Sequence, residues 1–256
     1  MNVLQNLIEL YNHLSPDSTY RNVIRMILLH LEEAAGATIY DLAELTNSSR
    51  TTIKRLLDKL GYSGYSQFHE ALRQAVRNYT YYNRMMPRQI RGESIVTELK
   101  DEMAAVSDAG SRDLSYPELE AMTECVRQKR KVLFFQLSST AVHVFQQNLA
   151  IAGIETQDLM ILPEFLQCLE DTGKDSLVFL RTLEYAETQD LTGIFRKMKE
   201  KGVTVILFGN PDSRYAEFVD RFLLEDSGKS GVIGNLILTD MYIFALNEVF
   251  RKRYID

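Results

Sequence analysis

Apolar residues recur every three or four positions through the first third of the chain, the spacing of one face of a helix. The pattern predicts a helix at the N-terminus, a second from about Ser15 to Gly36, and a further one from about residue 63 past Leu72. Between them it predicts two short helices, at about Ile39–Leu45 and Arg50–Leu60. No strand pattern interrupts them, so this part of the chain is expected to be entirely helical.

The two short helices are separated by a turn of only a few residues, which is typical of a helix-turn-helix unit. Thr38 and Asp41 have the spacing of a capping box, and Ser49 is a suitable N-cap for the second helix. Within that helix, Ile53, Leu56, Leu57 and Leu60 share one face. The opposite face carries Arg50, Thr51, Lys54, Arg55 and Asp58.

From about Ile95 the pattern changes to short apolar runs alternating with helical stretches. The runs predicted to be strands are KRKVLFFQL, residues 156–162, SLVFL, VTVILFG and FLLE. Helices are expected at about 95–106, 116–128, 142–152, 189–200, 212–220 and 235–251. Such alternation predicts a parallel sheet with helices on both faces. The fold class is therefore an all-α helix-turn-helix domain followed by an α/β doubly wound domain.

Between the two patterns, the stretch YTYYNRMMPRQIRG contains a proline and a glycine and has no helical stripe. It is interpreted as a linker. The predicted domains are residues 1–78 and 95–256, joined by a linker at 79–94.

Charge is unevenly distributed between these parts. The chain has a net charge of −6, but residues 50–91 hold nine Lys and Arg against two Asp and Glu. Residues 92–256 hold 18 against 27. This asymmetry favours a polyanionic partner for the N-terminal domain alone.

Other features narrow the class of protein. No run reaches the ~20 apolar residues of a membrane helix, and the N-terminus lacks the basic start and cleavage site of a signal peptide. Cys125 and Cys168 have no CxxC partner, so no disulfide or zinc site is expected. We therefore expect a cytoplasmic protein with reduced thiols, no metal, no cofactor and no membrane partner.

A helix with a free polar N-terminus and one basic face fits the major groove of double-stranded DNA. Arg50, Thr51 and Lys54 are assigned to base edges. The residues assigned to the phosphate backbone are Ser49, Thr52, Arg55 and Lys59, with hydroxyl contacts from Tyr62 and Tyr65.

The run IYDLAELTNSSRTTIKRLLDKLGYSGYSQFHEAL resembles the RpiR family of bacterial transcription regulators. Those proteins have an N-terminal helix-turn-helix domain and a C-terminal SIS (sugar isomerase) domain. The sequence departs from the family pattern at Ser48, usually a buried valine, and at Leu56, usually phenylalanine. The resemblance implies a DNA-binding regulator that binds a carbohydrate derivative and forms a homodimer or tetramer.

SIS domains hold phosphosugars with two loops, one similar to GxGxS and one similar to SxSGxT. Here the first loop reads Gln136-Leu137-Ser138-Ser139-Thr140, without either glycine, and the second reads RTLEYAET. The candidate ligand residues are Ser138, Ser139, Thr140, Arg181, Thr182 and Thr188. Either this crevice binds an anion through hydroxyls and the Arg181 guanidinium, or its ligand has changed or been lost, since Glu184 and Glu187 would repel phosphate.

No catalytic site is expected, and none of the nucleophile, nucleotide or metal motifs is present. Glu184 and Glu187 are candidates for a general base by their position, and His143 is expected to pack. The prediction is a transcription regulator responsive to a small phosphorylated metabolite. The alternative is a sugar-phosphate-binding or isomerase-like SIS protein whose helical domain contacts another protein.

Overall fold

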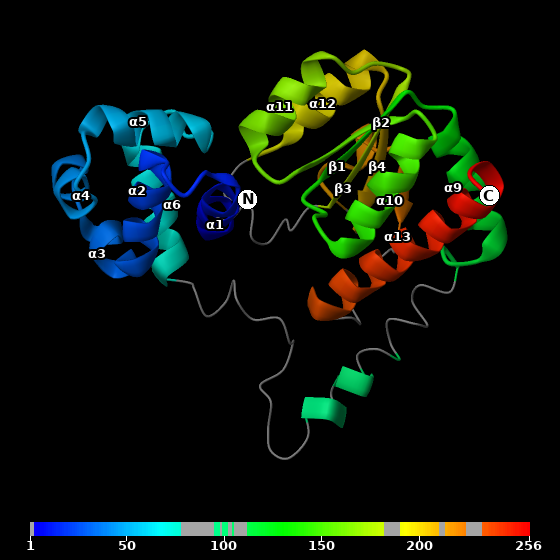
Figure 1. The fold of residues 1–256 in the computed structure, drawn as a ribbon, viewed down its shortest axis with the longest axis horizontal. Coiled ribbons are helices and arrows are strands. Elements are labelled where there is room, and N and C mark those ends of the chain that lie inside the picture. The colour runs from blue at the N-terminus through cyan, green and yellow to red at the C-terminus, as the bar shows by residue number, and fades with distance from the viewer. Residues whose placement is uncertain are drawn as a thin grey trace. The chain divides into compact units, whose positions relative to one another are not determined.

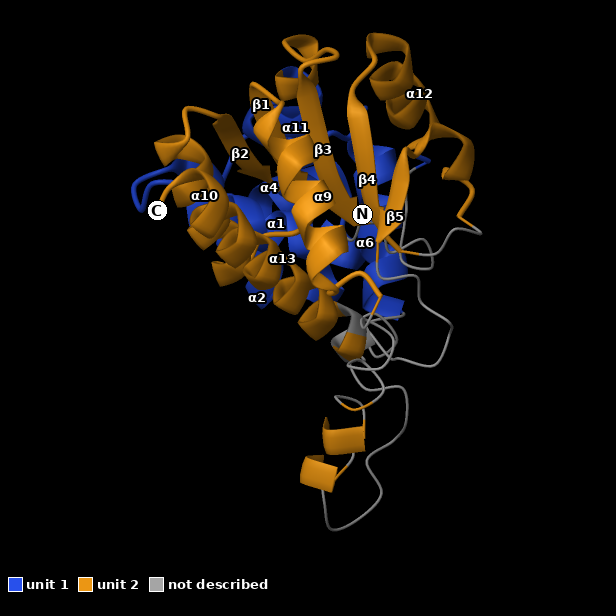
Figure 2. Cartoon of the chain, turned by 90° about the vertical axis from the view of Figure 1, so that its right-hand side faces the viewer, with its two compact units in different colours: residues 1–83, 160–167, 183–190 blue, residues 84–159, 168–182, 191–256 orange. Residues whose placement is uncertain are grey.

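A computed structural model describes residues 3–77, 95–97, 99–101, 104, 112–181, 190–209, 213–223 and 232–256. The chain divides into two compact units (Figure 2). One comprises residues 1–83, 160–167 and 183–190, and the other comprises residues 84–159, 168–182 and 191–256. The predicted linker, residues 79–94, lies outside the described residues, as do residues 98, 102, 103, 105 and 106 of the predicted helix at 95–106.

The N-terminal part is helical, as predicted (Figure 1). Its helices are α1 (Val3–His13), α2 (Thr19–Leu29), α3 (Leu31–Gly36), α4 (Ile39–Leu45), α5 (Arg50–Lys59) and α6 (Tyr65–Arg77). Their apolar stripes meet in one core around Leu7, Ile24, Leu56 and Phe68, all of them fully buried. This core holds α4 and α5 in the relative placement that the short turn between them allows.

The predicted helix from Ser15 to Gly36 is wrong in two respects. The structure begins α2 at Thr19, after Ser18, because the preceding residues form a turn in which the Ser18 amide donates to the Ser15 carbonyl at 2.9 Å. The helix also breaks at His30, whose φ of −126° and ψ of 46° are not helical. Two helices, α2 and α3, therefore replace one.

The C-terminal part contains five parallel strands in the order β2-β1-β3-β4-β5. The strands are β1 (Lys131–Phe135), β2 (Glu155–Leu159), β3 (Ser176–Arg181), β4 (Thr204–Phe208) and β5 (Arg221–Leu223). The helices are α9 (Tyr116–Arg127), α10 (Thr140–Ile151), α11 (Leu162–Glu170), α12 (Thr192–Lys201) and α13 (Val232–Tyr254). This strand order is one of the common doubly wound arrangements, so the predicted fold class is confirmed.

Both faces of the sheet are covered, because successive strand side chains point to opposite sides. Val132, Phe134 and Phe179 belong to the core beneath α9, α10 and α13. Leu133 and Val178, which alternate with them, are equally buried but lie outside that cluster. Continuous burial on both faces explains why the central strands read as unbroken apolar runs.

The predicted helix at 212–220 is wrong for its described residues. Only Ala216–Phe218 form a short 3-10 helix there. Tyr215 is fully buried instead, stacks on Phe195 with 4.3 Å between ring centroids, and accepts a hydrogen bond from the Leu191 amide at 3.3 Å. The packing of the Tyr215 ring, and not a continuous helix, holds this segment in place.

Candidate functional site

The helix α5 begins with the predicted cap. The Ser49 hydroxyl accepts a hydrogen bond from the Thr52 amide at 3.1 Å, and the hydroxyls of Ser49 and Thr52 lie 2.9 Å apart. The preceding turn is closed by Asn47, whose φ of 47° is in the left-handed region that asparagine tolerates better than most residues. The turn and the cap together fix the direction in which α5 leaves α4.

The two faces of α5 differ as the sequence predicts. Ile53, Leu56 and Leu57 are at most 1% exposed. The residues of the opposite face that are exposed are Arg50, Thr51, Lys54, Arg55, Asp58 and Lys59, and Ser49 before the helix is exposed as well. Thr52 is half-buried. A row of basic side chains is therefore offered to solvent by a helix whose other side is anchored in the core.

Two basic residues of α5 lie over tyrosine rings that the sequence analysis did not single out. The Arg50 guanidinium carbon is 4.5 Å from the centroid of the Tyr40 ring, and the Lys59 ammonium is 5.8 Å from that of Tyr20. Tyr40 is 64% exposed, on α4. An exposed aromatic residue in the first helix of the unit was the available signal.

The two tyrosines predicted to contact phosphate are placed differently from that prediction. Tyr62 is only 4% exposed and packs edge-on against Phe68, and burial raises its pKa well above the ordinary range. The Tyr65 hydroxyl donates to the Ala37 carbonyl at 2.7 Å. Burial and the nearby Asp41 carboxylate raise the pKa of Tyr65 to about 12. The Tyr62 ring and the Tyr65 hydroxyl thus make contacts within the domain.

The second candidate site lies where the strand order of the sheet reverses. The chain leaves β1 toward β2 on one side and reaches β3 on the other, so the crevice of this fold opens at the carboxyl ends of β1 and β3. The register pairs Phe135 with Leu180. The 136–140 loop and Arg181 therefore leave neighbouring strands at the same edge, as the sequence analysis assumed.

One residue of the 136–140 loop has a backbone conformation that glycine usually adopts, although the loop contains no glycine. Gln136 has a φ of 59°, in the left-handed region, and its amide donates to the Leu159 carbonyl at 3.0 Å. The Ser139 hydroxyl caps α10 by accepting a hydrogen bond from the Val142 amide at 3.3 Å. Ser138 and Thr140 are exposed. The N-terminus of α10 and two hydroxyls thus face the crevice end of the sheet.

The remaining crevice residues are only partly described. Arg181 ends β3 and is half-buried. Thr182, Thr188, Glu184 and Glu187 lie outside the described residues. The expectation that His143 packs is wrong, because its side chain is 60% exposed and its Nε2 lies 3.5 Å from the Asp158 carboxylate on β2.

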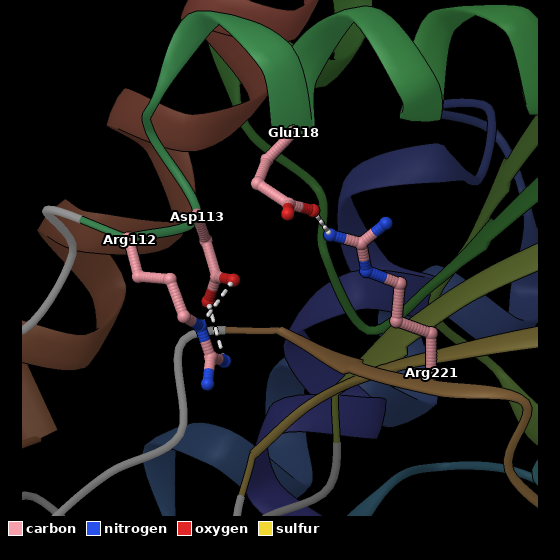
Figure 3. Close-up of polar contacts among 4 residues, drawn as sticks. All are labelled: Arg112, Asp113, Glu118 and Arg221. Atoms are coloured by element: carbon pink, nitrogen blue, oxygen red, sulfur yellow. Dashed lines mark hydrogen bonds and ion pairs between the residues drawn. The ribbon is translucent and has the colours of Figure 1, made fainter.

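Figure 3 shows a separate group of charged side chains beside α9. Arg112 and Asp113 pair in the turn before the helix, at 3.2 Å. Glu118 in its first turn accepts from Arg221 of β5 at 2.5 Å. Because the Glu118–Arg221 pair ties α9 to the edge strand β5, we interpret the group as structural.

Among the described residues, no group of three His, Cys, Asp or Glu side chains is placed to hold a metal ion. No helix among them has the length and apolar character needed to cross a membrane.

Comparison with known proteins begins with the N-terminal domain. Residues 1–79 match the helix-turn-helix domain model of the rpiR family. The chain is 24% identical over 204 residues to the uncharacterized HTH-type transcriptional regulator YbbH of Bacillus subtilis (strain 168), covering 78% of this chain and 71% of that protein. It is 23% identical over 227 residues to the HTH-type transcriptional regulator HexR of Escherichia coli (strain K12), covering 84% and 76%.

Solved structures that the chain matches include the Vibrio vulnificus NanR protein complexed with ManNAc-6P, at a TM-score of 0.46 and 18% identity over 99% of this chain and 92% of that one. They also include the sugar isomerase domain of the RpiR transcription factor from Sphaerobacter thermophilus, at a TM-score of 0.46 and 15% identity over 61% and 88%. Both curated relatives are HTH-type transcriptional regulators. Residues 1–79 of the chain are therefore a helix-turn-helix domain of the rpiR family.

Proposed function

We propose that this regulator reads the major groove of DNA with α5 and responds to a small phosphorylated or otherwise anionic metabolite in the crevice of its parallel-sheet domain. In this proposal residues 1–78 form the DNA-binding domain, 79–94 the linker, and 95–256 the effector and dimerisation domain. Binding of the metabolite changes operator affinity by shifting the relative placement of two DNA-binding domains.

The observation that carries the DNA part is the exposed basic face of a helix whose polar N-terminus follows a tight turn. Residues near the start of such a helix reach base edges, so Arg50, Thr51 and Lys54 are proposed to read sequence. Contacts to phosphate set position rather than sequence. The residues proposed for that role are Ser49, Thr52, Arg55 and Lys59.

The test is the affinity of the full-length protein for a duplex that it enriches from a random-sequence library. Arg50→Ala and Lys54→Ala should each weaken binding by about 1–3 kcal/mol and relax the preference at one base position. Arg196→Ala is the matched control, because it removes one exposed positive charge from α12 in the other unit. Equal binding by all four proteins would refute the role of α5.

The effector part rests on the geometry of the crevice. The N-terminus of α10 offers backbone amides and a favourable dipole to an anion. Ser138 and Thr140 can donate hydroxyl hydrogen bonds, Ser139 fixes the helix end, and the Arg181 guanidinium has the planar form that pairs with phosphate oxygens. Thr182 and Thr188, which lie outside the described residues, are proposed as further ligand residues.

The effector is tested by thermal denaturation of the full-length protein with phosphosugars, amino-sugar phosphates and inorganic phosphate. A ligand present at about 100 times its Kd stabilises the folded state by about 2.7 kcal/mol. Thr140→Val should abolish the stabilisation, whereas the same substitution at the exposed Thr19, the first residue of α2, should leave it intact. No stabilisation by any compound, in a protein that still binds its duplex, would overturn the effector proposal and leave the DNA proposal standing.

Helix-turn-helix regulators that bind two-fold operators act as symmetric dimers. We propose that α13 contributes to this assembly. Its buried side includes Leu238, Tyr242 and Leu246, yet Met241 and Phe244 on the same helix are 40% and 43% exposed. Large apolar side chains left partly exposed on a long helix are consistent with a further contact in the assembled protein.

A further inference from the structure

The most exposed aromatic side chain of the helix-turn-helix unit is paired with the first residue of α5. Tyr40 is the second residue of α4 and is 64% exposed. Arg50 lies across the turn, and its guanidinium carbon is 4.5 Å from the centroid of the Tyr40 ring. The stacking distance is well within the ~6 Å over which a ring attracts a cation. The pair therefore links the two helices at the end of α5 that enters the groove.

We propose that Tyr40 is a positioning residue that holds the Arg50 guanidinium ready to read a base, an inference that rests on the proposed DNA-binding function. An exposed arginine samples many rotamers, and fixing it on binding has an entropic cost. A guanidinium that already lies on an aromatic face loses less freedom when it forms its hydrogen bonds. The Tyr40 ring thus favours one orientation of the Arg50 guanidinium before DNA binds.

The location of the pair limits what it can affect. Arg50 is the first residue of α5, where side chains reach base edges, and Ser49 caps the helix immediately before it. Tyr40 lies on α4, the helix that is expected to cross the DNA backbone in a helix-turn-helix complex. Loss of the ring should therefore act on the base read by Arg50 and leave other base preferences unchanged.

The chain supplies its own comparison at the opposite end of α5. Lys59 lies 5.8 Å from the centroid of the Tyr20 ring. This contact also places a cation on a tyrosine, but it is longer, involves an ammonium, and lies in the last turn of α5. Removing the Tyr20 ring should change the overall affinity at most slightly and should not change which bases are preferred.

The ring, and not the hydroxyl, carries the proposed role. Tyr40→Phe keeps an aromatic face of the same size and removes only the oxygen. Tyr40→Leu keeps an apolar side chain and removes the face. If the hydroxyl instead contacted a phosphate, both substitutions would weaken binding to every sequence equally, because phosphate contacts carry no direct sequence information.

The experiment is selection from a random-sequence duplex library by the full-length wild-type protein and by the Arg50→Ala, Tyr40→Phe, Tyr40→Leu and Tyr20→Leu variants. Arg50→Ala identifies the base position that Arg50 reads. At that position Tyr40→Leu should lower the preference about two- to fivefold, the factor that corresponds to an exposed cation–π contact. Tyr40→Phe and Tyr20→Leu should keep the wild-type preference.

A double variant completes the test, because Tyr40→Leu should have no additional effect in an Arg50→Ala background. Full preference in Tyr40→Leu, while Arg50→Ala loses it, overturns the inference alone. An equal loss in Tyr40→Phe and Tyr40→Leu also overturns it. No enriched duplex for the wild type, or no loss in Arg50→Ala, overturns the proposed function itself. Thermal denaturation of each variant shows whether it is still folded, so that a lost base preference is not confused with unfolding.

Discussion

At the scale of single residues, Ser48 places a hydroxyl inside the turn between α4 and α5. Its amide donates to the Ala43 carbonyl at 2.8 Å, but its Oγ is buried without a hydrogen-bond partner among the described residues. The family usually has valine here. A buried polar group without a partner costs about 1–3 kcal/mol.

We therefore expect Ser48→Val to raise the free energy of unfolding by about 1 kcal/mol or more. Ser48→Thr is the matched control, because threonine has nearly the shape of valine and keeps the hydroxyl. The two variants are compared by urea denaturation. A threonine variant as stable as the valine variant would mean that shape rather than polarity limits this turn.

Gln136 carries the second residue-scale prediction. Its φ of 59° costs a non-glycine residue about 1–2 kcal/mol, and glycine would recover that cost less roughly 0.5–1 kcal/mol of backbone entropy. Gln136→Gly should thus be slightly more stable than the wild type, whereas Gln136→Val should be less stable. Denaturation midpoints check the order, and a glycine variant below the wild type would show that the Gln136 side chain contributes to the loop.

The tyrosines show the limit of prediction from sequence at this scale. The apolar spacing and the Ser49 cap were enough to place Arg50, Thr51 and Lys54 on an exposed face, because local periodicity decides which way a helical residue points. It did not separate buried Tyr62 from exposed Tyr40. That distinction depends on where Phe68, which packs against Tyr62, lies in the folded domain.

At the scale of elements, the start of α4 is stabilised by a capping box that depends on the ionised carboxylate of Asp41. The Thr38 hydroxyl and amide donate to the Asp41 carboxylate at 2.7 and 3.0 Å, and the Asp41 amide donates back to the Thr38 hydroxyl at 3.3 Å. The hydroxyl's hydrogen bond, followed by that of the amide, lowers the pKa of Asp41 below its ordinary value.

Because the pKa of Asp41 is lower in the folded state, its contribution to stability is fully present above the unfolded-state pKa and is lost as pH falls through the folded-state value. Asp41→Ala should therefore destabilise the domain at neutral pH and progressively less in acid. Urea denaturation at several pH values measures this. A difference between the two proteins that stays constant down to acid pH would exclude the carboxylate as its source.

The strands were predicted more accurately than the helix ends. β1, β3 and β4 are buried on both faces, so their apolar runs stand out from the flanking charge. β2 is an edge strand with exposed polar residues, and its predicted position was displaced toward Leu162. The burial of Tyr215 depends on its contacts with Leu191 and Phe195, which are distant in sequence and which a local pattern does not contain.

At the scale of the whole molecule, the proposed dimer connects α13 to DNA binding. Phe244→Glu should yield a monomer in analytical ultracentrifugation and weaken operator binding, because a charge at an apolar contact is costly to bury. Leu29→Glu, at a 64% exposed leucine of α2, is the control. A Phe244→Glu protein that remains dimeric would exclude this part of α13 from the interface.

The central claim is that the basic face of α5 binds DNA, and the most direct test is duplex affinity as a function of salt concentration. Binding that neutralises phosphates weakens steeply with added salt, and each phosphate contact removed should lower the logarithmic slope by about one. We predict steep salt dependence for the wild-type protein and a shallower slope for the variant Arg55→Ala, Lys59→Ala. Affinity independent of salt, or identical slopes for the two proteins, would contradict the account.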